Sequence, residues 1–77
     1  MNSDLKLLDV VALERAVPDE GLRRGQVGTI VEDLGENAFE VEFSDDEGRA
    51  YAFAAVSSAD LLKLVYAPQK SDGAKEQ

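Results

Sequence analysis

Two neighbouring segments of patterned residues constrain the fold of this chain more than any other feature. The segment GQVGTIVE at residues 25–32 opens on a glycine turn, and the segment FEVEF at residues 39–43 follows it. Because successive side chains of a strand point to opposite faces, the apolar residues of FEVEF can line a core while its two glutamates face water. The pattern predicts half-buried strands of a small β-barrel.

Turn-forming residues divide the chain into five expected strands. Gly35 and Asn37 tolerate positive φ, and Gly48 ends a second turn that begins at Asp45. Ser57 and Asp60 have the spacing of a capping box for a short helical turn before the last strand. We expect an all-β, five-stranded SH3-like barrel with strands at about residues 9–13, 27–34, 38–44, 49–56 and 61–66. The composition of residues 15–25 predicts a long loop with Leu22 tucked inward.

Length and composition limit what this chain can contain. Its 77 residues leave room for one core, so we expect a domain at residues 1–66 and a disordered tail at residues 67–77, which holds no hydrophobe larger than alanine. The lack of cysteine and histidine excludes disulfides, zinc fingers and imidazole chemistry. No segment approaches the roughly 20 apolar residues of a membrane span. We therefore expect a cytoplasmic protein with no membrane partner.

The net charge of −8 is concentrated in one part of the chain. Residues 32–47 contain eight acidic residues and no basic one, whereas the rest of the chain holds equal numbers of each. Such a hairpin attracts basic partners and repels phosphate backbones. We predict a partner-binding site at Glu40, Glu42, Asp45, Asp46 and Glu47. The alternative interpretation is an ordinary solvated surface.

Four segments together resemble a known family. They are DVVALE at residues 9–14, GLRRGQVGTIVE at residues 21–32, FEVEFSDDEGR at residues 39–49 and LLKLVY at residues 61–66. They resemble the small bacterial proteins of the domain-of-unknown-function 4926 family. The part GxxGTIVE is similar to KOW-type modules of ribosomal and transcription proteins. The resemblance implies an SH3-like fold and carries no assigned reaction, so it supplies no catalytic residue.

The residues that remain offer little catalytic chemistry. The run Asp45–Gly48 lacks the D-x-D-x-D-G spacing of a calcium loop and is typical of a hairpin turn. Glu40 and Glu42 are alternate residues on one strand, so they lack the unlike environments that separate the pKa values of an acid and a base. Ser57 and Ser58 have no histidine to activate them. We expect no enzyme, no metal and no cofactor.

The aromatic and arginine residues have two interpretations each. Tyr51 and Phe53, with Tyr66, could form a shallow groove for a polyproline helix, but core packing accounts for them better. If one side of the fourth strand is instead open, that side is a contact surface. Arg23 and Arg24 could hold an anion, although pairing with the acidic hairpin is the favoured role.

These patterns predict a small non-catalytic module that binds a basic protein partner, as antitoxins and immunity-type inhibitors do. Contact would run through the acidic hairpin or the apolar fourth strand. The alternative is a KOW-like nucleic-acid or ribosome-associated module, which needs Arg15, Arg23, Arg24 and Arg49 on one face. The sequence leaves open whether the chain forms a homo-oligomer.

Overall fold

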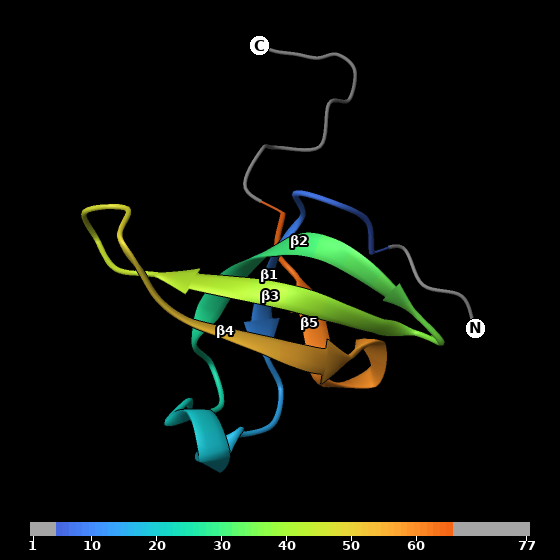
Figure 1. The fold of residues 1–77 in the computed structure, drawn as a ribbon, viewed down its shortest axis with the longest axis horizontal. Helices are drawn as coiled ribbons and strands as arrows, with labels where there is room; N and C mark the ends of the chain where they lie inside the picture. Colours follow the sequence, from blue (N-terminus) through green and yellow to red (C-terminus); the bar gives the residue numbers. More distant parts are fainter. Residues whose placement is uncertain (1–4, 66–77) are drawn as a thin grey trace, which may run out of the picture.

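Five antiparallel strands form a single sheet in the order β4-β3-β2-β1-β5 (Figure 1). The computed structural model describes residues 5–65. The elements are β1 (Val10–Leu13), η1 (Pro18–Glu20), β2 (Val27–Gly35), β3 (Ala38–Ser44), β4 (Ala50–Ser57), η2 (Ser58–Asp60) and β5 (Leu61–Lys63). Residues 1–4 and 66–77 lie outside the described residues, and with them the expected tail and the end of the expected last strand.

The predicted all-β class, the five strands and the helical turn before the last strand are confirmed. The sheet edges β4 and β5 do not pair with each other within residues 5–65, so hydrogen bonds do not close the predicted barrel. The Ser57 hydroxyl caps η2 by accepting from Ala59 N at 3.3 Å. The helices of this region are the two 3-10 turns η1 and η2, and neither is long enough to cross a membrane.

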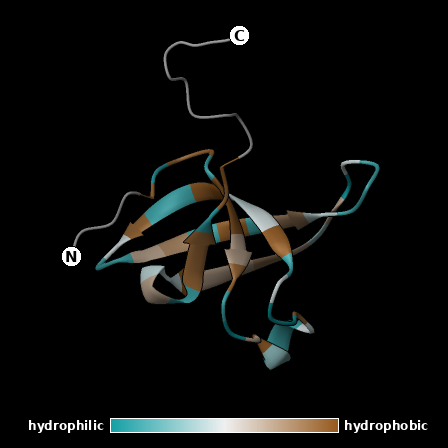
Figure 2. Cartoon of the chain, turned by 180° about the vertical axis from the view of Figure 1, so that it is seen from behind, coloured by the Kyte–Doolittle hydropathy of each residue, from teal (hydrophilic) through white to brown (hydrophobic). Residues whose placement is uncertain are grey.

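The core lies on the inner face of the sheet. Val11, Ile30, Val41 and Phe43 are fully buried there and come from β1, β2 and β3. Leu22 is 2% exposed and reaches the same core from the long loop, as predicted. A bridge between Val17 and Leu22 and the 3-10 turn η1 give that loop its shape. Figure 2 shows the η1 region and the β3–β4 turn as largely hydrophilic beside the browner strands.

Gly28 allows β2 to pack closely against β3. It lies within β2, opposite Val11 of β1 and Phe43 of β3. A Cβ atom at this position would lie 2.7 Å from Glu42 O and 2.7 Å from Val41 Cγ1. Glycine is therefore required here by space.

The two hairpin turns largely follow the local residue preferences. Gly35, the last residue of β2, and Asn37 have positive φ as their residue types predict, whereas the positive φ of Glu36 between them is one that its residue type disfavours. In the second turn, Asp45 Oδ1 accepts from Glu47 N at 2.9 Å and from Arg49 N at 3.0 Å, and Gly48 has a φ of 80°. The predicted turn chemistry is confirmed.

Candidate functional site

The outer face of β3 and β4 brings the strand glutamates beside the exposed ring of Phe53. Alternation along β3 turns its buried residues inward and its two glutamates outward, where both are half-buried. A bulge in β2 between Ile30 and Glu32 places Glu32 directly opposite Glu40. We call this surface the acidic–aromatic face; it consists of Glu32, Glu40, Glu42, Phe53 and Ala55.

The strand register fixes which side chains of this face are neighbours. Ser58 N donates to Asn37 O at 2.7 Å, and hydrogen-bonded and non-hydrogen-bonded pairs alternate from there along β3 and β4. Side chains of a non-hydrogen-bonded pair are the closer kind, with Cα atoms about 4.5 Å apart. The non-hydrogen-bonded pairs are Ala38–Ser57, Glu40–Ala55 and Glu42–Phe53.

The carboxylates of Glu32, Glu40 and Glu42 have no cationic partner within residues 5–65. The four ion pairs of this region join other residues, and no side-chain hydrogen bond reaches these three groups. Glu32 and Glu40 are like charges in directly opposed positions, an arrangement that destabilises a sheet. The face therefore presents negative charge that the described part of the chain does not neutralise.

The five predicted partner-binding residues fall into two groups. Glu40 and Glu42 lie on the face, whereas Asp45, Asp46 and Glu47 form the tip of the β3–β4 hairpin. The tip carboxylates are partly engaged, because Asp45 accepts two backbone N–H groups and Glu47 pairs with Arg49 Nη2 at 2.6 Å. Tyr51 joins the tip residues around a shallow hollow. Within residues 5–65, no group of acidic side chains is arranged to hold a metal ion.

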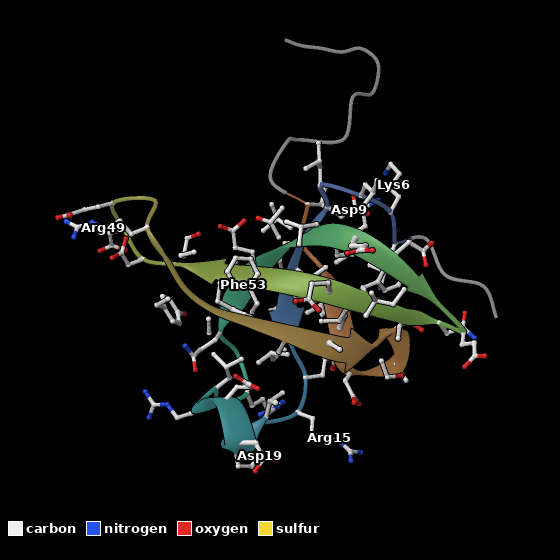
Figure 3. All side chains as sticks on the ribbon, viewed as in Figure 1. Lys6, Asp9, Arg15, Asp19, Arg49 and Phe53 are labelled. Carbon is white, nitrogen blue, oxygen red and sulfur yellow. The ribbon has the colours of Figure 1, made fainter. Side chains whose placement is uncertain are left out.

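Tyr51 and Phe53 are each 51% exposed, so the predicted core packing of these residues is wrong. The opposite residues of β4, Ala54 and Val56, fill the core instead. Tyr51 is held in place because its Oη accepts from Gln26 Nε2 at 2.9 Å. Figure 3 shows the Phe53 ring lying over β3. The alternation of aromatic and small residues along β4 indicates that one face differs from the other. Because residues 50–56 are apolar on both faces, their composition predicts burial of both.

Two of the arginines that the KOW-like alternative needs, Arg15 and Arg49, lie far apart (Figure 3). Arg15 pairs with Asp60 at 3.5 Å and Arg49 with Glu47, and these two arginines lie at different ends of the molecule (Figure 3). Within the described residues no ion pair joins Arg23 or Arg24 to the acidic hairpin, contrary to the favoured expectation. Arg49 alone of these residues neutralises part of the hairpin.

Asp9 has a perturbed pKa, and it lies away from the acidic–aromatic face. Its side chain is 11% exposed, and Lys6 N donates to Oδ2 at 2.9 Å. Lys6 Nζ lies 3.3 Å from Oδ1 and Lys63 Nζ lies 3.6 Å from Oδ2. Burial acts to raise the pKa of Asp9, but the hydrogen bonds from Lys6 and the charges of both lysines outweigh it and lower the pKa. The group ties the start of β1 to the end of β5.

The fold and this face define a small all-β domain with an acidic surface that residues 5–65 do not neutralise and that carries the exposed ring of Phe53. The chain belongs to the family described as domain of unknown function (DUF4926), whose sequence profile matches residues 7–63. No curated protein and no solved structure matches the chain. The SH3-like and KOW resemblances stay predictions.

Proposed function

We propose that this protein is a non-catalytic binding module that takes a basic protein partner on the acidic–aromatic face. One observation carries the proposal: the unpaired carboxylates of Glu32, Glu40 and Glu42 share a surface with the exposed ring of Phe53. Antitoxins and immunity-type inhibitors are the functional class that this surface fits best.

The acidic–aromatic face and the tip of the hairpin have different tasks in binding. The hairpin charge steers a basic surface toward the face and raises the association rate, an effect that salt weakens. Phe53 supplies apolar area that is already exposed, so a partner can cover it without rearranging the domain. The charged tip acts mainly on the rate, and the aromatic centre acts mainly on the lifetime of the complex.

Partner capture from a lysate of the native host tests the proposal. The test variant carries Glu40→Lys and Glu42→Lys, and the matched control carries Asp19→Lys and Glu20→Lys, which makes the same charge change at exposed residues of η1. We expect basic proteins to be retained by the natural chain and by the control and to be lost from the test variant.

Binding of nucleic acid by the natural chain is the outcome that would contradict the proposal. If the natural chain instead shifts duplex DNA or structured RNA with a steep salt dependence, and Arg23→Glu with Arg24→Glu removes that shift, the proposal fails. Equal capture of the same proteins by the test variant and the control would also refute it. Circular dichroism of each variant establishes that it is folded.

A further inference from the structure

Phe53 and Glu42 form one row of the acidic–aromatic face. They are a non-hydrogen-bonded pair across β3 and β4, and Thr29 of β2 continues the row on the other side of Glu42. A half-exposed ring and a carboxylate thus lie side by side, with no cation from residues 5–65 between them. A planar cation bound here can contact the Phe53 ring with its flat face and the Glu42 carboxylate with its edge at the same time.

Arginine and lysine differ in how they use such a row. A guanidinium group stacks flat on an aromatic ring while its N–H groups, which lie in the same plane, reach a neighbouring carboxylate. The ammonium group of lysine is a compact and strongly hydrated charge that has no fork to match the carboxylate. The pairing of Phe53 with Glu42 therefore favours arginine.

A second row lies two residues along the strands. It consists of Ala55 on β4, Glu40 on β3 and Glu32 on β2. The small side chain of Ala55 leaves the approach to Glu40 open, and two opposed carboxylates gain from a shared cation. Two residues of a strand span about 7 Å, which is also the spacing of alternate side chains in an extended ligand.

The outer face of β3 and β4, rather than the edge of β4, is the more open surface for a partner. The 3-10 turn η1 lies beside β4, and the Gln26–Tyr51 hydrogen bond ties the loop that follows η1 to the start of the same strand. A strand added at the β4 edge would meet this hydrogen-bonded loop at the start of β4. Within residues 5–65 no element covers the outer face above Phe53 and Ala55, since both residues are exposed.

We infer that the acidic–aromatic face binds an extended segment of a protein partner with arginines at alternate positions. One arginine stacks on Phe53 and pairs with Glu42, and the next lies over Ala55 and pairs with Glu40 and Glu32. This inference rests on the proposed function, since it specifies which basic residues the face selects.

Two synthetic peptides of equal length and charge test the selection. One alternates arginine with serine and the other alternates lysine with serine, and calorimetric titration measures the Kd of each for the full chain. We expect the arginine peptide to bind about two- to fivefold more tightly, the range of a cation–π contact at an exposed site. Phe53→Leu keeps an apolar side chain without a ring and should abolish this preference, whereas Leu62→Ala, at a residue of similar exposure on β5, should leave it intact.

The outcomes separate this inference from the proposed function. Equal binding of both peptides, or a preference that survives in folded Phe53→Leu and Phe53→Ala variants, overturns arginine selection while charge-based binding stands. If neither peptide binds at low salt, both the inference and the proposed function are refuted. Loss of binding of both peptides in Glu40→Gln with Glu42→Gln supports the placement of the site.

Discussion

Substitution of Gly28 by alanine should destabilise this domain, although a glycine inside a strand is ordinarily the less stable choice. The added Cβ would lie 2.7 Å from Glu42 O, 2.7 Å from Val41 Cγ1 and 2.9 Å from Phe43 Cδ2. Carbon and oxygen approach ordinarily to about 3.3 Å, and two carbons pack best at about 3.5–4.0 Å. Strand β3 would have to move away, and Glu42 O cannot move without disturbing the ladder between β2 and β3.

The expected magnitude follows from this crowding. Overpacking of a well-packed core costs about 1–3 kcal/mol, which exceeds the gain of about 0.5–1 kcal/mol that alanine ordinarily has over glycine in a strand. The net loss of roughly 1–2 kcal/mol lowers the Tm of a domain of this size by about 4–16 °C. Gly28→Val should cost more, because its further methyl groups meet the same neighbours.

Thermal and denaturant melts followed by circular dichroism measure the effect, and Gly21→Ala is the matched control. Gly21 has a φ of 70°, and a Cβ atom added there would meet nothing within 4 Å. Alanine at this position therefore costs about 1 kcal/mol of backbone strain without a clash. A Gly28→Ala variant that melts at or above the temperature of the natural chain would refute the close packing of β2 against β3.

Three further perturbations test other parts of the structure. Because the pKa of Asp9 is lowered in the folded state, its contribution to stability is present above the ordinary pKa and is lost as the pH falls from about 4 through the lowered value. The Asp9→Asn variant should therefore be less stable than the natural chain at neutral pH and should lose less stability on acidification. Urea melts at several pH values measure this, and parallel stability curves for the two chains would contradict the assignment. Glu40→Gln relieves the opposition to Glu32 and should raise the stability at low salt by about 0.2–1 kcal/mol, with added sodium chloride erasing the difference; a gain that persists in high salt would point to another cause. Leu22→Ala, at a buried residue of the long loop, should cost about 2–4 kcal/mol in denaturant melts, and a cost below about 1 kcal/mol, on the order of a surface substitution, would show that the loop does not dock.

Local sequence pattern was sufficient for the elements whose geometry depends on near neighbours. The bounds of β3, residues 38–44, agree with the expectation, because strict alternation leaves one register that buries its three large apolar side chains. The positive φ values of Gly35, Asn37 and Gly48 also follow from residue type alone. The last strand is shorter than expected, since pairing with β1 spans only Leu61–Lys63.

The candidate site depended on contacts that no local pattern contains. The eight acidic residues of the hairpin are visible in the sequence, but the bulge in β2 is what sets Glu32 opposite Glu40. Alternation placed Phe53 on one face of β4, yet only the position of β4 at the sheet edge, with no second layer over that face, left the ring exposed.

Strand period, turn propensity and charge belong to single residues and their near neighbours, so the all-β class, the turns and the acidity of one hairpin could be predicted from the chain alone. The ion pairs could not be predicted from the sequence alone. Only the folded domain shows that Arg49 pairs with Glu47 of the hairpin and that Lys63 pairs with Asp9. Such pairings follow from turn geometry, strand order and register, and order and register are set by the burial of the whole core rather than by any one segment.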